Sequence, residues 1–162
     1  MRMIILTPTT YEFQIARERF KESDQEIILA GVGPRNMKRL LSQLEVPRST
    51  PIMIFGFAGS NSLKVGTEVY VTESYLYFET ATYGDDPASL SRPNLPGAPE
   101  LGVPCYSSTD FVTRSSLIQP AIFDMELGFL TVDFPQITAW RIVSDNLSLN
   151  EFNDFVGRGH KS

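Results

Sequence analysis

Three carboxylates of this chain stand close to points where apolar segments end. Glu12 follows the apolar run 3–6, Asp145 comes after the run 137–143, and Glu126 lies within the segment 123–130. Ligands of parallel α/β sheets gather at the carboxyl ends of the strands, so these side chains are expected to converge. Carboxylates of this kind can perform acid and base chemistry on a glycosidic bond. Because the chain has 19 acidic residues, solvated surface positions are the alternative interpretation.

Strands and helices alternate in the part of the chain that must position Glu12. The apolar runs 3–6, 26–30 and 51–59 predict buried strands, the last of them running into a glycine-bearing turn. Thr9 or Thr10 can cap a helix from about residue 11, and residues 36–44 have the spacing of a second helix. This order predicts an α/β domain with parallel strand pairing.

The later segments predict a longer strand and a closing helix. Residues 67–78 are rich in Val, Tyr and Thr and predict a strand or hairpin, and residues 137–143 predict another strand. Residues 84–104 are rich in Pro and Gly and predict a loop without secondary structure. Residues 115–134 predict a helix in their second half, which would carry Met125 and Glu126, and residues 149–156 predict a final helix.

Composition limits the classes of protein and partner that fit the chain. Its 162 residues are 42% hydrophobic, which argues for one domain over residues 1–162 with a sizeable core. The net charge of −5 argues against nucleic acid and anionic membranes as partners. No apolar run approaches the ~18 residues that span a bilayer, and we expect a cytoplasmic protein.

The cysteine and histidine content argues against metal and disulfide chemistry. The single Cys105 excludes a disulfide framework and a Cys-based zinc site, and we expect it to be a buried structural thiol. The single His160 lies near the end of the chain, where we expect a frayed terminus. No cluster has the spacing of metal ligands, so the sequence predicts neither a metal nor a cofactor.

Several motifs occur in the order in which one enzyme superfamily has them. Residues 55–69, FGFAGSNSLKVGTEV, resemble the Gly-x-Ala-Gly turn and Leu-Lys-Val-Gly-Asp run of the nucleoside phosphorylase and nucleosidase superfamily. Residues 108–112, 123–126 and 141–145 resemble its Ser-Gly-Asp-x-Phe, Met-Glu and Arg-x-Ile-Ser-Asp motifs, and residues 150–155 its closing helix. The resemblance implies a three-layer α/β fold with a central mixed, mostly parallel sheet flanked by helices, and a homodimer or larger assembly.

The first predicted strand end distinguishes two branches of that superfamily. Residues 7–12, TPTTYE, contain none of the glycine and arginine of a phosphorylase phosphate cradle. Glu12 falls where 5′-methylthioadenosine/S-adenosylhomocysteine nucleosidases and related hydrolases keep their water-activating glutamate. A carboxylate there repels a phosphate dianion but can orient and deprotonate water. The resemblance therefore favours hydrolysis of a purine nucleoside, a small-molecule partner, over phosphorolysis.

The resemblance also implies roles for the residues that contact the base and the ribose. Asp145 would give a proton or hydrogen bond to N7 of the purine, and Ser144 would help to hold that carboxyl. Glu126 would accept hydrogen bonds from the ribose hydroxyls. Phe111 would stack on the base, for which plain core packing is the alternative.

Two further residues complete the implied binding site. Met125 would pack on the ribose face, and its alternative interpretation is helix core. Val112 would offer backbone hydrogen bonds to the base.

The chain departs from the superfamily pattern at three places. Phe57 stands where relatives have a Ser or Thr whose hydroxyl helps to hold the nucleophile. Residues 84–104 stand in place of a helix and a strand, and the histidine expected after the long strand is absent from residues 75–79, YLYFE. Three alternatives therefore stay open: a phosphate-dependent purine nucleoside phosphorylase, a nucleoside-binding relative without turnover, and a partner-binding role for the Pro-rich loop.

Overall fold

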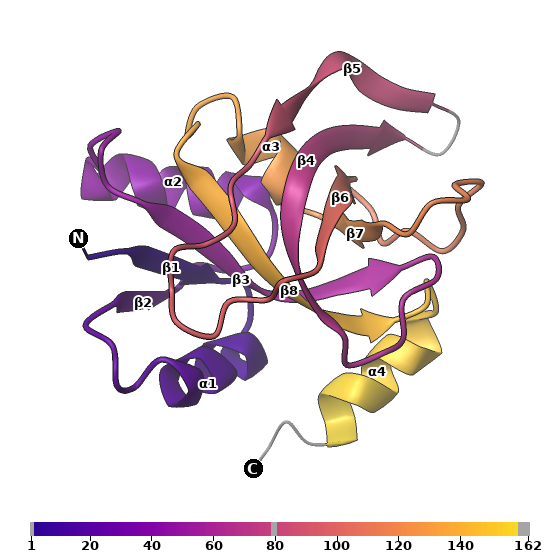
Figure 1. Cartoon of the computed structure of the whole chain (residues 1–162), viewed down its shortest axis with the longest axis horizontal. Coiled ribbons are helices and arrows are strands. Elements are labelled where there is room, and N and C mark those ends of the chain that lie inside the picture. The colour runs from indigo at the N-terminus through magenta and orange to yellow at the C-terminus, as the bar shows by residue number, and fades with distance from the viewer. Residues whose placement is uncertain (1, 79–80, 159–162) are drawn as a thin grey trace.

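Eight strands and four helices follow one another in the computed structural model, which describes residues 2–78 and 81–158 (Figure 1). Their bounds are β1 (Ile4–Thr7), α1 (Thr10–Arg19), β2 (Glu26–Leu29), α2 (Pro34–Leu44), β3 (Ile52–Ser60), β4 (Glu68–Phe78), β5 (Ala81–Ser89), β6 (Gly102–Ser107), β7 (Ile122–Asp124), α3 (Leu127–Leu130), β8 (Ile137–Asp145) and α4 (Leu149–Arg158). The alternation of strand and helix up to β3 confirms the prediction for that part of the chain.

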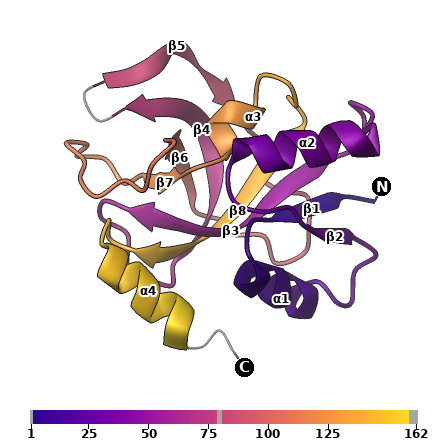
Figure 2. The same ribbon diagram turned by 180° about the vertical axis from the view of Figure 1, so that it is seen from behind.

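The strands form one mixed sheet. Its order is β2-β1-β3-β7-β6-β4-β5, and β8 pairs with both β3 and β4. The pairs β1–β2, β1–β3, β3–β8, β4–β6 and β6–β7 are parallel, whereas β3–β7, β4–β5 and β4–β8 are antiparallel. The predicted mixed, mostly parallel sheet is therefore confirmed, and Figure 2 shows the helices around it from the other side.

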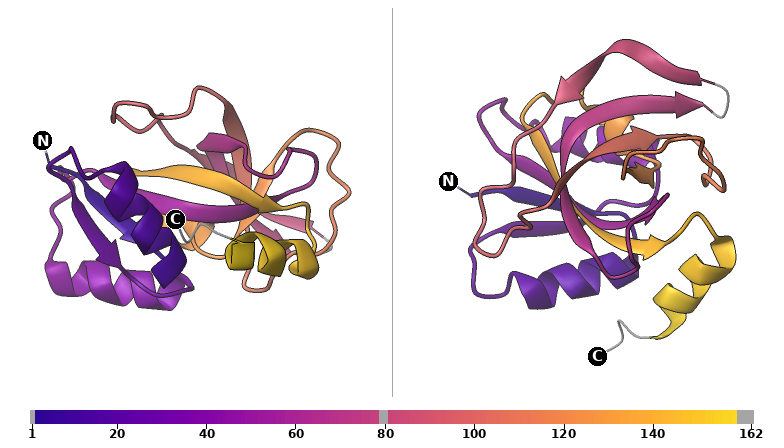
Figure 3. Two further views of the ribbon diagram at one scale, coloured as in Figure 1. Left: turned by 90° about the horizontal axis from the view of Figure 1, so that it is seen from below. Right: turned by 45° about the vertical axis from the view of Figure 1, so that its right-hand side comes forward.

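Helices cover both faces of the sheet because successive strand side chains point to opposite faces. One core cluster contains Met37 and Leu41 of α2 together with Leu127 of α3. The other contains Ala16 of α1, with Phe152 of α4 packed against it. Figure 3 shows α1 and α4 on the same side of the strands. The three-layer architecture expected from the resemblance is confirmed.

The prediction of a structureless loop over residues 84–104 is wrong at both ends. Residues up to Ser89 belong to β5, and β6 begins at Gly102. Pro87 is compatible with a strand because β5 lies at the edge of the sheet. Pro104 is compatible because the β4 register shifts opposite it, between Val71 and Ser74. Within residues 84–104, only residues 90–101 lack regular structure.

The helix predicted in the second half of residues 115–134 is also wrong in extent. Residues 122–124 form the strand β7, and α3 begins only at Leu127. The carboxylate of Asp124 accepts a hydrogen bond from Leu127 N at 3.1 Å, and Ser107 Oγ accepts one from Gly128 N at 2.7 Å. These two bonds satisfy N–H groups at the start of the helix, which explains why the helix begins there. Met125 and Glu126 therefore lie between a strand and a helix, outside both.

Three smaller features complete the comparison with the sequence. The Gly-x-Ala-Gly segment is part of β3, which continues to Ser60, so the expected turn begins after that residue. Cys105 is a free, fully buried thiol, as predicted. His160 lies outside the described residues. Within those residues, we find no helix with the length and apolar character needed to cross a bilayer.

Candidate active site

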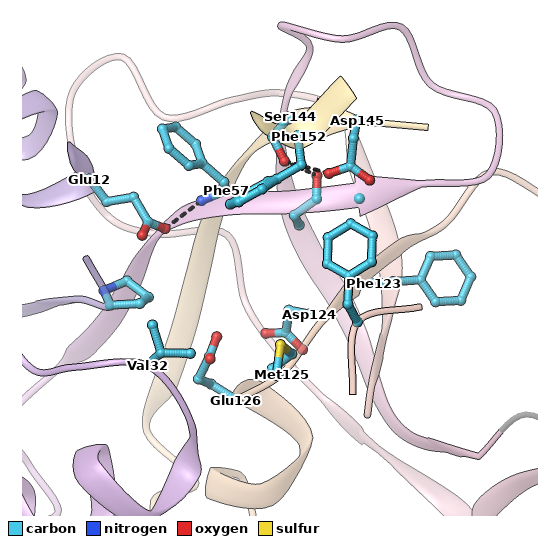
Figure 4. Close-up of a pocket in the computed structure, with 14 residues that line it drawn as sticks. Glu12, Val32, Phe57, Phe123, Asp124, Met125, Glu126, Ser144, Asp145 and Phe152 are labelled. Atoms are coloured by element: carbon cyan, nitrogen blue, oxygen red, sulfur yellow. Dashed lines mark hydrogen bonds between the residues drawn. The ribbon is translucent and has the colours of Figure 1, made fainter. Parts of the chain in front are cut away.

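One pocket brings together segments that are distant in the sequence (Figure 4). It lies at the ends of β1, β3, β7 and β8. Its lining consists of Pro8, Glu12, Val32, Phe57, Ala58, Gly59, Phe111, Phe123, Asp124, Met125, Glu126, Ser144, Asp145 and Phe152. Six of the seven predicted site residues are among them. The seventh, Val112, lines a smaller adjoining hollow together with Phe111 and Asp145.

Glu12 reaches the pocket from the first turn of α1 and is almost completely buried. Its Oε1 accepts a hydrogen bond from the hydroxyl of Thr9 at 2.6 Å, and its Oε2 accepts one from the backbone N–H of Phe57 at 2.7 Å. Thr9 is also the N-cap of α1, and it is one of the two residues, Thr9 and Thr10, that the sequence predicted for this role. Each carboxylate oxygen thus has one fixed donor, which sets the orientation of the group.

The backbone of β3 leaves room for Glu12 only because residue 56 is glycine. A Cβ at Gly56 would lie 1.8 Å from Glu12 Oε2 and 2.8 Å from its Cδ. The carboxylate therefore rests directly on the strand. The other end of α1 is fixed by Phe20, whose ring packs edge-on against Phe55 and Trp140 at centroid distances of 5.3 and 5.2 Å.

Burial is the main influence on the protonation of Glu12. Removal from water raises the pKa of this carboxyl above its usual value, because the charged form loses its hydration. The hydrogen bonds from Thr9 and Phe57, and the positive charge of Arg141, act in the opposite direction. The result is a carboxylate with raised basicity, which is the property that a general base needs.

Asp145 lies at the end of β8, where an irregularity in the sheet places it in the pocket. Ala58 pairs with Val143 and Gly59 pairs with Asp145, so Ser144 is an extra residue on β8. Such bulges redirect side chains next to functional sites. A Cβ at Gly59 would lie 2.9 Å from Asp145 Oδ2, so this carboxylate also lies over a glycine of β3.

Two donors hold the Asp145 carboxyl. The hydroxyl of Ser144 donates to Oδ1 at 2.7 Å, and the backbone N–H of Leu147 donates to Oδ2 at 3.0 Å. Burial raises the pKa of Asp145, and these hydrogen bonds oppose that shift. A carboxyl with a raised pKa can keep its proton closer to neutral pH and act as an acid.

Glu126 lies below the other two carboxylates in the view of Figure 4 and connects the pocket to the β2–α2 turn. Its Oε2 accepts a hydrogen bond from Gly33 N at 3.0 Å. Burial, followed by the nearby negative charge of Asp124, raises the pKa of Glu126 to about 7. The turn at residues 31–34, which the sequence analysis did not assign to the site, therefore contributes a donor from Gly33 and a lining side chain from Val32.

Sequence reasoning missed a buried ionic group beneath the pocket. Arg141 is completely buried on β8 and forms an ion pair with Asp124, and its Nη2 lies 3.6 Å from Glu126 Oε1. Asp124 also accepts a hydrogen bond from the hydroxyl of Ser107. A signal was present, because an arginine inside the apolar run 137–143 requires a buried acidic partner. The identity of that partner was not readable from the run itself.

The remaining walls of the pocket are apolar. The rings of Phe111 and Phe152 meet at a centroid distance of 5.9 Å with an interplanar angle of 65°. Phe57 points toward α4, where its ring packs edge-on against Phe155 at 5.1 Å. The site thus has a contribution from Phe57 that its side-chain type did not indicate, namely the backbone N–H that binds Glu12.

Among residues 2–78 and 81–158, no three His, Cys, Asp or Glu side chains are grouped as a metal ion would require. The acids near the pocket are instead paired with Arg141 or with hydroxyl and N–H donors. This arrangement combines buried carboxylates of raised pKa with aromatic walls, and it suits proton transfer on a flat, aromatic ligand.

The fold of this chain is one that solved nucleosidases share. A scan against models of known protein families finds no match, and a search of curated proteins finds none either.

Three solved structures represent the likeness. The 5′-methylthioadenosine/S-adenosylhomocysteine nucleosidase of Helicobacter pylori aligns with a TM-score of 0.72 at 15% identity, over 96% of this chain and 91% of that chain. The futalosine hydrolase of the same organism aligns with a TM-score of 0.73 at 15% identity over the same shares. A Chlamydia trachomatis nucleosidase of the first kind aligns with a TM-score of 0.71 at 13% identity, over 96% and 87% of the two chains. At these identities the likeness establishes the fold.

Proposed function

We propose that this protein is a purine nucleoside N-ribosyl hydrolase. The observation that carries the proposal is the placement of Glu12 and Asp145 at opposite sides of one pocket, each over a glycine of β3. Gly56 and Gly59 are three residues apart, which is about 10 Å along a strand. This separation leaves space for a ribose and its attached base between Glu12, which would activate water, and Asp145, which would bind the base.

Glu12 has the position and the basicity to activate water. Its two oxygens are each held by one donor, and each oxygen has a second lone pair available for a water molecule. In the proposed reaction Glu12 takes a proton from water as the water oxygen forms a bond to the anomeric carbon. Removal of the carboxylate therefore removes the nucleophile's activation.

Asp145 has the position and the pKa shift to assist departure of the base. As the glycosidic bond breaks, its electron pair moves to the purine, and the Asp145 carboxyl supplies a proton or hydrogen bond to N7. The base then leaves neutral. Ser144, which donates to Asp145 at 2.7 Å, holds the carboxyl in the orientation for this transfer.

Glu126 and Met125 would bind the ribose. The carboxylate of Glu126 is fixed by Gly33 N and can accept hydrogen bonds from the ribose hydroxyls. Met125 lies beside it in the lining and would pack on the sugar. These contacts hold the ribose while positive charge develops at the anomeric carbon. Phe111 would stack on the base, and Val112 would bind its edge.

The charge of the pocket favours water over phosphate as the nucleophile. The residues that line the pocket in the described structure include Glu12, Asp124, Glu126 and Asp145, but no Lys, Arg or His. A phosphate dianion would meet several carboxylates without a cation in that lining, which is electrostatically unfavourable. Arg141, which lies beneath the pocket, is already paired with Asp124.

The test is release of free base from a panel of purine nucleosides. Methylthioadenosine, adenosylhomocysteine, aminodeoxyfutalosine and inosine are incubated with the protein, with and without phosphate, and free base is measured by chromatography. We expect release without phosphate from at least one of the four. Release that requires phosphate would replace the proposal with phosphorolysis, and release from none would contradict turnover of this class.

A matched pair of variants ties the release to the site. Glu12→Gln removes the proposed base, whereas Glu18→Gln makes the same change on the same helix at a side chain that is 75% exposed and paired with Lys21. We expect loss of release in the first variant and full release in the second. Equal activity of the two would contradict the role of Glu12.

A nucleoside-binding protein without turnover is the second candidate, and Phe57 favours it. In relatives the residue at this position is expected to supply a hydroxyl that helps to hold the nucleophile, and here the side chain packs on Phe155 instead. Calorimetry with the same four nucleosides separates the candidates. Binding of a nucleoside that is not cleaved would establish the second.

A further inference from the structure

The loop that would hold the base has no regular structure of its own. Residues 108–121 connect β6 to β7 and carry Phe111 and Val112. Val112 and Leu117 pack against a small cluster of Tyr77, Ala121 and Phe123, which supports only part of the loop. Something else must fix its course, because an irregular segment of this length loses much entropy when it is ordered.

Asn61, directly after β3, forms three hydrogen bonds to the backbone of this loop. Its Nδ2 donates to Leu117 O at 3.1 Å and to Gln119 O at 2.9 Å, and its Oδ1 accepts from Ala121 N at 3.0 Å. Both amide protons and the amide oxygen are thus used on one segment. Only an amide side chain offers two donors and an acceptor in this arrangement.

The same turn also holds the segment that follows Asp145. Nδ2 of Asn146 donates to Ser60 O at 3.2 Å and to Leu63 O at 2.7 Å. Ser60 in turn donates from its hydroxyl to Ala121 O at 2.7 Å. The turn at residues 60–63 is therefore attached on one side to the loop of Phe111 and on the other to the strand end of Asp145.

We infer that Asn61 is a positioning residue that sets the spacing between Phe111 and Asp145 and thereby the affinity for the base. The inference rests on the proposed function and adds a residue to it. The hollow lined by Phe111, Val112 and Asp145 lies between the two segments that the turn holds. A base bound there would have its face on Phe111 and its edge at Val112 and Asp145, so its affinity depends on that spacing.

Loss of Asn61 affects binding more than the chemical step. Without the three bonds the loop samples detached positions, and the apparent affinity falls in proportion to the fraction of molecules with the loop in place. A fall of that fraction to about one tenth raises KM about tenfold. The carboxylates that carry out the reaction stay in place, so kcat changes little.

The experiment compares Asn61→Ala with Gln136→Ala in the intact protein. Gln136 is a matched control, because its amide also donates to a loop carbonyl, Pro47 O, but lies outside the lining of the pocket. Hydrogen exchange of the backbone amides in residues 111–121 is measured without ligand, and KM and kcat are measured on the nucleoside that the wild type cleaves. We expect about tenfold faster exchange and a KM raised about tenfold for Asn61→Ala alone.

The outcomes separate this inference from the proposed function. Unchanged exchange in residues 111–121, or a fall in kcat without a rise in KM, would overturn the inference even if the wild type is a hydrolase. If the wild type releases no base, the proposed function fails. The inference is then decided by hydrogen exchange in residues 111–121 and by the affinity for adenine, measured by calorimetry on the wild type and on Asn61→Ala. Should Asn61→Ala not fold, Asn61→Asp keeps the size and the acceptor but removes both donors, and the same results are expected from it.

Discussion

Glu12 and Asp145 are held in similar ways by different parts of the fold. Each carboxyl lies over a glycine of β3 and receives one hydroxyl and one backbone N–H donor. The donors of Asp145 are Ser144 and Leu147, which are its close neighbours in the sequence. The backbone donor of Glu12 is instead Phe57, which is 45 positions away.

The donors of Asp145 are thus local in the sequence, whereas the backbone donor of Glu12 comes from a distant strand. The hydrogen-bond donors of Asp145 lie in one bulge and the turn after it, so both come from a short segment of the sequence. The Glu12 end depends on the packing of α1 against β3, since the carboxylate of one element rests on the backbone of the other. Residues that act in chemistry need orientation within small tolerances, and the two ends reach it by different routes. Substitutions at the two ends can show whether these ends also differ in role and in tolerance.

The largest effects are expected from removing the two carboxyls, and the leaving group should distinguish them. Glu12→Gln and Asp145→Asn are each expected to lower kcat on a purine nucleoside by about 10²–10⁴-fold, the usual range for loss of a general acid or base. On 4-nitrophenyl riboside, whose leaving group departs without protonation, the defect of Asp145→Asn should largely disappear. The defect of Glu12→Gln should persist, because water must still be activated.

Release of nitrophenolate, followed by its absorbance, provides the measurement. Purine release from the same preparations is the reference, and Glu18→Gln on the exposed side of α1 is the control variant. Equal rescue of both variants by the nitrophenyl substrate would remove the distinction in role between the two ends.

The next effects concern the two glycines. A Cβ at residue 56 would lie 1.8 Å from Glu12 Oε2. Gly56→Ala must therefore displace the carboxylate by about 1 Å or more. A misplacement of about 1 Å can cost about 10²-fold in rate, and we expect a loss of that size. At residue 59 the closest atom, Asp145 Oδ2, would be 2.9 Å away, and a shift of a few tenths of an ångström relieves the contact.

We therefore expect Gly59→Ala to lose less than about tenfold in kcat. Both variants are compared by kcat and by thermal unfolding, so that a general loss of stability is seen separately. A Gly59→Ala variant that is more impaired than Gly56→Ala, at similar stability, would show that the local end is the less tolerant one.

The same contrast explains what the sequence could predict. The Ser144–Asp145 pair is visible in a five-residue motif, and the strands and helices up to β3 follow from apolar spacing. Contacts such as Glu12 with Phe57, or Arg141 with Asp124, join residues whose proximity depends on how the strands pair. Local patterns contain no information on that pairing beyond the general preference for parallel neighbours.

The mistakes in the secondary structure have the same origin. Pro87 and Pro104 favour a loop when they are judged by composition, but their effect depends on strand position in the sheet. One lies on an edge strand and the other lies opposite a register shift. The short helix α3 was predicted to begin too early because its start is set by Asp124 and Ser107, and Ser107 comes from another strand.

Glu126 belongs to neither end, and its titration offers a test of smaller size. Its pKa is raised to about 7, and its ionised form is the one that can accept hydrogen bonds from both ribose hydroxyls. KM should therefore rise as the pH falls below about 7, by about tenfold between pH 8 and pH 6. In Glu126→Gln, KM should be high and independent of pH over the same range.

As the pH falls, the stability of the ligand-free protein should increase, whereas the affinity for the substrate should decrease. A carboxyl whose pKa is higher in the folded than in the unfolded chain binds more protons when folded, so it favours folding at lower pH. The contribution of Glu126 to the free energy of unfolding is thus expected to increase as the pH falls through about 7 toward the unfolded pKa. Denaturation of the wild type and of Glu126→Gln between pH 5 and 8 measures this contribution. A wild-type KM that does not change with pH would contradict the proposal that Glu126 binds the ribose.

The smallest effects are expected from the two hydroxyl donors, and they should differ in sign. Both hydroxyls lower the pKa of the carboxyl that they bind, so Thr9→Val raises the pKa of Glu12 and Ser144→Ala raises that of Asp145. In the proposed reaction Glu12 acts ionised, so a higher pKa removes activity on the acid side of the pH profile. Asp145 acts protonated in that reaction, so a higher pKa extends activity on the alkaline side.

Thr9→Val should thus narrow the pH profile of kcat/KM, and Ser144→Ala should widen it. Thr9→Ser keeps the hydroxyl, and with it both the hydrogen bond to Glu12 and the N-cap, so it should restore the acid limb. Thermal unfolding reports the N-cap separately, because its loss in Thr9→Val costs about 1 kcal/mol of stability. The profiles are measured between pH 5 and 9 beside thermal unfolding at each pH. Shifts of both variants in the same direction would mean that the two carboxyls act in the same protonation state, and the division into a base at the α1 end and an acid at the β8 end would then be wrong.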